Sequence, residues 1–202
     1  MGRDTFNEAE RFLISKWADS RQLELSMGKV REKYVAVVQR VVDTVGARNE
    51  NLDASTIKVT QHWGNGYVGL GRKAWHSKGS SPTGYYIENI RLEILADESE
   101  PPPMAYIWLK PAVQNGADFA RALAAVRKAA RKSLSKDELR ACQFMDDEET
   151  VLSLGFLPGR KDLLEMLSQA DSQAFVDCLV SQFEILTRFN EVLDSVLIKT
   201  AR

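Results

Sequence analysis

The sequence predicts an α+β fold, because its hydrophobic periodicity changes twice along 202 residues. Apolar residues lie three and four positions apart in residues 1–46 and 116–202, as in helices. In residues 56–111 they alternate with polar residues, as in strands. Helices that flank a run of strands, without alternating with them, favour α+β over α/β. We therefore expect one domain: N-terminal helices, a four-stranded antiparallel meander, and a C-terminal helical half packed on one sheet face.

The first 46 residues predict two helices. Thr5 and Glu8 have the spacing of a capping box at the start of the first helix. The second helix is predicted from the valine-rich run of residues 30–45, whose apolar positions follow a helical period. That period outweighs the strand preference of valine. Gly46 is expected to end the second helix in a left-handed conformation.

Four strands are predicted around residues 57–63, 67–75, 90–94 and 105–110, each with one apolar face. Their short connections predict an antiparallel meander.

The C-terminal half predicts a series of helices. Ser135 and Glu138 form a second capping box, residues 146–154 read as a short helix, and a last long helix begins near Asp171. The apolar stripe of that last helix is wide, and it includes Phe175, Leu179, Phe183, Leu186, Phe189, Leu193 and Val196. A wide stripe predicts either an internal core helix or a homodimer formed through this helix.

The segment HWGNGYVGLGRKAW contains the G-x-G-x-x-G spacing of dinucleotide-binding loops at Gly64, Gly66 and Gly69. Such a loop must lead into a helix, but the residues that follow alternate like a strand. Asn65-Gly66 instead favours a hairpin turn. Gly69 and Gly71 share one face of the following strand, which indicates a bulge or another backbone passing close over this face. A ligand on this face is a further alternative.

Tyrosine and tryptophan are concentrated in the strand region, and their polar tips favour a partner or water over a dry core. If the registers allow, an aromatic and basic sheet face contains the candidate binding residues Tyr67, Lys73, Trp75, Tyr85, Arg91, Tyr106, Trp108 and Lys110. Such a face suits a protein interface or the stacked bases of a nucleic acid or nucleotide. Alternatively, the N-terminal helices simply cover it.

Catalytic and metal-binding motifs are not found in the sequence. Glu88, Glu93 and Asp97 with Lys110 have the components of a metal-dependent nuclease, but Trp108 stands where the acid before the lysine is needed. His62 and His76 are expected at opposite ends of a hairpin, so neither a metal nor a cofactor is expected. An enzyme with a carboxylate site that lacks a motif remains an alternative.

Charge and cysteine content indicate the class of protein. The chain has 27 basic and 28 acidic residues, without the basic excess of a dedicated nucleic-acid binder. Two isolated cysteines and the lack of a signal-peptide core or a membrane-length apolar run predict a cytoplasmic protein. We expect a non-enzymatic interaction or regulatory protein that acts through the aromatic sheet face or the C-terminal helices. A nucleic-acid or nucleotide module is the first alternative.

Overall fold

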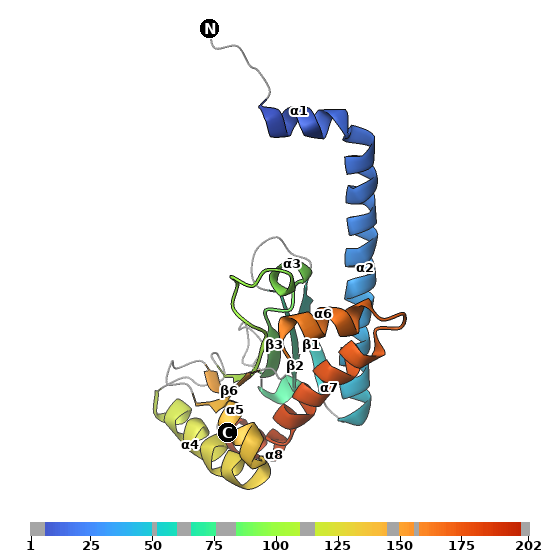
Figure 1. The fold of residues 1–202 in the computed structure, drawn as a ribbon. Coiled ribbons are helices and arrows are strands. Elements are labelled where there is room, and N and C mark those ends of the chain that lie inside the picture. The colour runs from blue at the N-terminus through green and yellow to red at the C-terminus, as the bar shows by residue number, and fades with distance from the viewer. Residues whose placement is uncertain are drawn as a thin grey trace.

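The computed structural model describes residues 7–49, 52–59, 66–75, 84–109, 116–144, 150–155 and 158–198. An antiparallel sheet is covered by helices on one face, and the N-terminal helices extend away from this body (Figure 1). The α+β class is therefore confirmed. The helices are α1 Glu8–Ser15, α2 Trp17–Arg48, α3 Leu92–Leu95, α4 Gly116–Ser133, α5 Lys136–Ala141, α6 Arg160–Ser168, α7 Gln173–Thr187 and α8 Asn190–Leu197.

The sheet has the strand order β1-β2-β3-β4-β6-β5, and every described pairing is antiparallel. Its strands are β1 Asp53–Lys58, β2 Tyr67–Gly71, β3 Gly84–Glu88, β4 Met104–Trp108, β5 Cys142–Gln143 and β6 Thr150–Gly155. The first four strands form the predicted meander. The prediction of only four strands was wrong, because β6 and β5 extend the sheet beyond β4.

The position predicted for the third strand was wrong. β3 ends at Glu88, and residues 92–95 form the short helix α3. Asn89 makes this change possible: it adopts φ 62° and donates from Nδ2 to the carbonyl oxygen of Pro102 at 2.8 Å. Ile90 and Ile94 are buried nevertheless. Their spacing of four fits a helical turn as well as an alternating strand, so the pattern did not discriminate between the two.

The helix predicted for residues 146–154 was also wrong where the structure describes it, since residues 150–155 form β6. Leu152 and Leu154 point into the core, opposite Ile107 and Ala105 of β4. An apolar run this short has no distinctive period, so pairing with β4 decides its conformation.

The helices divide the core face of the sheet among themselves. α2 packs on β1 and β2, α7 packs on β3 and β4, and α4 packs on β6 and α8. The predicted last helix is divided into α7 and α8, which are separated at Arg188 and Phe189. Most of its apolar stripe is fully buried within the chain, including Phe175, Leu179, Phe183, Leu186, Phe189 and Leu193. The stripe therefore fits an internal core helix, and it leaves little surface for a homodimer.

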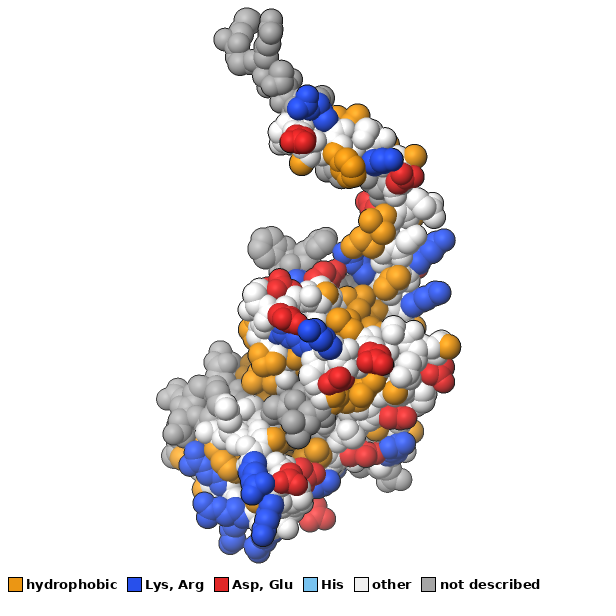
Figure 2. Space-filling model, viewed as in Figure 1, with side chains coloured by type: hydrophobic (Ala, Val, Ile, Leu, Met, Phe, Trp, Pro, Cys, Tyr) orange, Lys and Arg blue, Asp and Glu red, His pale blue; other side chains and the backbone are white. Residues whose placement is uncertain are grey.

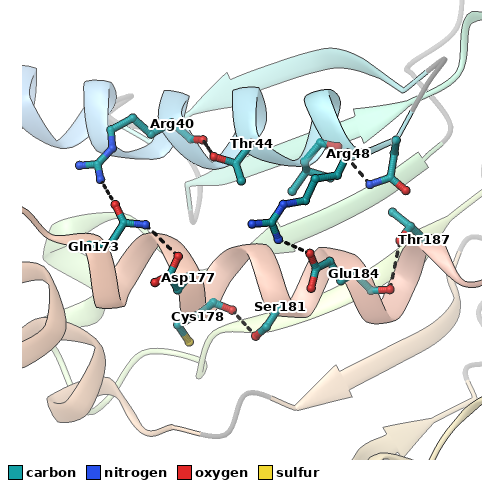
Figure 3. A network of polar contacts seen from close by, with 11 residues as sticks. Arg40, Thr44, Arg48, Gln173, Asp177, Cys178, Ser181, Glu184 and Thr187 are labelled. Atoms are coloured by element: carbon teal, nitrogen blue, oxygen red, sulfur yellow. Dashed lines mark hydrogen bonds and ion pairs between the residues drawn. The ribbon is translucent and has the colours of Figure 1, made fainter.

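Polar contacts join α2 to α7 along their exposed edge (Figure 3). Arg40 donates to the backbone oxygen of Asp171 at 2.7 Å and to the Gln173 side chain. Arg48 pairs with Glu184 nearer the end of α2. Val38, Val41 and Val45 are buried beneath these contacts, along the same helix. The C-terminal half of α2 is thus fixed to the body by both apolar and polar contacts.

Two predicted helix ends differ from the structure. Helix α1 begins at Glu8, and Asn7 with Glu10 makes the reciprocal capping bonds, at 2.9 and 2.7 Å. Thr5 lies outside the described residues. The prediction that Gly46 ends the second helix was wrong, since α2 continues to Arg48. The capping box of Ser135 and Glu138 at the start of α5 is confirmed.

A polar cluster anchors α8 to the segment that follows β2. Asp194 pairs with Arg72 through one oxygen and accepts from Trp75 Nε1 at 2.8 Å through the other. Tyr85 on β3 donates to Asn190 Oδ1 at 2.7 Å. Trp75 is almost fully buried, so its N–H needs this acceptor.

We expect Asp194→Ala to lower the free energy of unfolding by about 1–3 kcal/mol, because it removes the acceptor of both Arg72 and Trp75. Asp194→Asn should cost less, since its amide oxygen can still accept from Trp75. Denaturant unfolding measures both. Asp177→Ala on the exposed side of α7 is the control, with an expected change within about 0.5 kcal/mol. Equal stability of the Asp194→Ala and Asp177→Ala variants would contradict an anchoring role.

Candidate functional site

Three of the predicted binding residues share the sheet face opposite the helices. Tyr67, Tyr106 and Trp108 lie there, each half-buried, around the central ring of Tyr86. Tyr86 stacks on Tyr106 with ring centroids 5.6 Å apart, and it meets Trp108 edge-on at 5.6 Å and Tyr67 edge-on at 5.9 Å. We call these four residues the aromatic face. Tyr86 was not among the predicted binding residues, because the third strand was predicted at residues 90–94 and not at residues 84–88. The segment GYYIE is nevertheless typical of a strand.

Trp75 and Tyr85 lie on the other side of the sheet, in the core, with ring centroids 5.5 Å apart. Their assignment to the aromatic face was wrong. Tyr85 alternates with Tyr86 and sits opposite Ile107, which faces the helices. β2 ends at Gly71, and a 3₁₀ turn at Lys73–Trp75 follows. Strand alternation therefore no longer determines where the Trp75 side chain points.

The basic part of the predicted site is not assembled by the described residues. Arg91 immediately precedes α3, three positions beyond the end of β3, and pairs with Glu93 at 3.3 Å. The side chain of Lys73 and all of Lys110 lie outside what the structure describes, as do His62 and His76. Within the described residues, the predicted aromatic and basic face therefore contains only its aromatic members.

An acidic residue adjoins the aromatic face instead. Glu88 is the last residue of β3, directly opposite Met104 and beside Tyr67 on β2. It is hydrogen-bonded to the Tyr106 side chain. Burial, reinforced by the charge and hydrogen bond of Glu88, raises the pKa of Tyr106 well above its usual value. A carboxylate here repels phosphate, which disfavours nucleic acid on this face.

Gly69 explains how Tyr86 lies so flat on the sheet. A Cβ at Gly69 would overlap the Tyr86 ring, meeting Cδ1 at 2.8 Å. Only glycine leaves the ring room to cover the strand. The group that lies close to Gly69 is therefore an aromatic side chain of this chain, and not the backbone or ligand that the glycines predicted. The pairing of β1 with β2 is irregular between Ala54 and Thr56, so the irregularity lies in β1 and not in the glycine-containing β2.

The carboxylates considered for catalysis each have a different hydrogen-bond partner. Glu93 accepts from Arg31 at 2.9 Å, and Asp97 accepts from Ser99 at 2.7 and 2.9 Å in the following loop. Among the described residues, no three His, Cys, Asp or Glu side chains lie close enough together to hold a metal ion.

The most exposed apolar surface of the described chain lies on the N-terminal helices. We define the arm as residues 8–30, comprising α1 and the first part of α2. It projects from the body, and Figure 2 shows hydrophobic side chains on its surface. Seven large apolar side chains of the arm are between 45% and 68% exposed: Phe12, Ile14, Trp17, Leu23, Leu25, Met27 and Val30. Soluble monomers rarely expose so many together.

Three of these side chains continue the stripe that α2 buries in the body. At about 100° per residue, Leu23, Met27 and Val30 project from the same side of α2 as Tyr34, Val41 and Val45. Tyr34 is the first described residue of α2 to be buried, and its hydroxyl donates to the carbonyl oxygen of Ile90. We call Leu23, Met27 and Val30 the arm stripe. The second helix was predicted only from Val30 onwards, whereas α2 begins at Trp17, so neither Leu23 and Met27 nor the point where the body ends was predicted.

Comparison with protein-family models, curated proteins and solved structures finds no match to this chain. Among the described residues, no helix is long and apolar enough to cross a membrane.

We expect Gly69→Ala to lower the free energy of unfolding by about 1–3 kcal/mol, because the new methyl group displaces the Tyr86 ring. The control is Gly46→Ala in α2, where a Cβ would meet only the Leu52 carbonyl oxygen at 3.9 Å. The control should raise stability, by up to about 1 kcal/mol, through helix propensity. Denaturant unfolding compares the two. A Gly69→Ala variant as stable as the wild type would contradict the packing of Tyr86 over Gly69.

Proposed function

We propose that this protein is a non-enzymatic interaction protein that binds a protein partner through the arm stripe. One observation carries the proposal: the stripe that packs α2 onto the body continues past Tyr34 and is exposed at Leu23, Met27 and Val30. Burying three such side chains in an interface is favourable by about 1.5–3 kcal/mol each at full burial. A continuous apolar stripe on a helix is the usual contact surface for another helix.

The arm is held in place for binding at its base. Tyr34 packs against Phe175 with ring centroids 5.9 Å apart, and Arg31 donates to Glu93 from Nε and Nη2, at 3.1 and 2.9 Å. Helix α2 continues through this junction without interruption. A partner would therefore meet a helix that is already formed, which lowers the ordering entropy lost on binding.

The aromatic face is a weaker candidate for the same role. Its central ring, Tyr86, is buried, and Tyr67, Tyr106 and Trp108 are each covered in part by their neighbours. Helices α7 and α8 offer even less apolar surface to a partner, because their apolar residues form the core. The arm stripe differs from both, since its three side chains are between 45% and 62% exposed.

Photo-crosslinking tests the proposal. A benzophenone amino acid replaces Met27 in one variant and Leu25 in another. The two positions are similarly exposed, at 45% and 48%, but project from nearly opposite sides of α2. After irradiation in an extract of the source cells, we expect the Met27 variant to give a protein adduct several-fold more abundant than the Leu25 variant gives.

Adducts of equal abundance from both positions would mean only non-specific contact with the arm, and would contradict the proposal. A failure of the Met27 variant to crosslink any protein, itself included, would contradict it too. Mass spectrometry of the adduct identifies the protein bound.

A further inference from the structure

We infer that the occupant of the arm stripe is a second copy of this chain, whose α2 lies antiparallel against the first. This inference rests on the proposed function, and it names the partner. It is carried by the charges that flank the stripe on α2.

Each flank of the arm stripe has an acid far from the body and a base close to it. On one flank, Asp19 is followed by Lys33, and on the other, Glu24 is followed by Arg31. These assignments follow from the helical advance of about 100° per residue. Lys33 and Arg31 flank the point where α2 enters the body, whereas Asp19 and Glu24 lie out on the arm.

An antiparallel second copy matches these charges. If a two-fold axis passes close to Met27, Leu23 of one copy lies opposite Val30 of the other. Asp19 then lies within two positions of Lys33 of the second copy, and Glu24 within two positions of Arg31 of the second copy. In an antiparallel helix pair each flank faces its own equivalent, so every such contact occurs twice and joins opposite charges. Glu24 contacts Arg21 at 2.5 Å in the single chain, but an exposed pair of this kind is easily exchanged. Arg31 keeps its contact with Glu93, which it makes through Nε and Nη2, and Glu24 of the second copy lies beside that pair. The contact between Asp19 and Lys33 therefore carries most of the charge argument.

A parallel pair of α2 helices does not match these charges. It would set Asp19 on one flank against Glu24 on the opposite flank of the second copy, so that two acids face each other. It would also bring both bodies to the same end of the arms. The antiparallel arrangement instead places the bodies at opposite ends.

The arm's own charge disfavours other classes of occupant. Residues 8–30 contain four acidic and four basic residues, so the arm carries no net charge. A membrane surface or a nucleic acid would be attracted by a basic excess, which this arm lacks. A neutral arm does not repel its own copy.

Sedimentation equilibrium of the full chain tests the inference. We expect a dimer with a dissociation constant on the order of micromolar, as befits a short interface. Leu23→Ser with Met27→Ser should raise that constant by about 100-fold or more. Leu25→Ser is the matched control, since Leu25 lies on the same arm but away from the stripe, and it should leave the constant unchanged. Circular dichroism checks that each variant stays folded.

A charge exchange tests the antiparallel arrangement separately. Asp19→Lys alone should weaken the dimer by roughly tenfold at low salt, because it sets two cations against each other. Adding Lys33→Asp to the same chain should restore the dimer, since each pair is then rebuilt with reversed charges.

Three results would overturn the inference: a monomer at several hundred micromolar, a dimer unaffected by the double serine substitution, or no restoration by the charge exchange. Different results would contradict the proposed function. If the Met27 photo-adduct contains another protein while the chain alone stays monomeric, the arm still binds proteins and only the identity of the occupant is wrong. If no adduct forms with any protein, both fail.

Discussion

Packing of α2 against α7 and the sheet is the interaction on which the rest of the structure depends. Val38, Val41 and Val45 are fully buried, and they bring α2 over β1 and β2. Arg40 and Arg48 reach α7 from the same helix (Figure 3). Because one helix contributes both to the core and to the arm, the direction of the arm is fixed by the packing of the body.

The two faces of the sheet are built differently. The core face is covered by helices and closed by the polar cluster of Asp194, Arg72 and Trp75, in which Asp194 accepts from the buried N–H of Trp75. The opposite face relies on contacts between aromatic rings, with Gly69 leaving space for Tyr86. Aromatic residues therefore serve both faces, although they stood out in the sequence as one group.

The arm and the aromatic face place apolar side chains in contrasting surroundings. Rings on the aromatic face pack on one another, so each is partly protected from water by its neighbours. Side chains of the arm stripe follow one another along a single helix and gain no such protection. This difference, rather than residue type, makes the arm stripe the more exposed of these two apolar surfaces.

The sequence by itself determined the α+β class, the antiparallel meander between two mainly helical regions, and the Ser135 capping box. These depend on local periodicity and on hydrogen bonds between near neighbours. The hairpin turn predicted at Asn65-Gly66 stays a prediction, because Asn65 lies outside the described residues. Only the tertiary structure decided that residues 150–155 are a strand, because the edge of β4 pairs with them. It also decided that Tyr85 and Trp75 face the core, and that the stripe of α2 leaves the body at Tyr34. Periodicity shows which side of a helix is apolar, but burial depends on what lies opposite, and distant parts of the chain supply that.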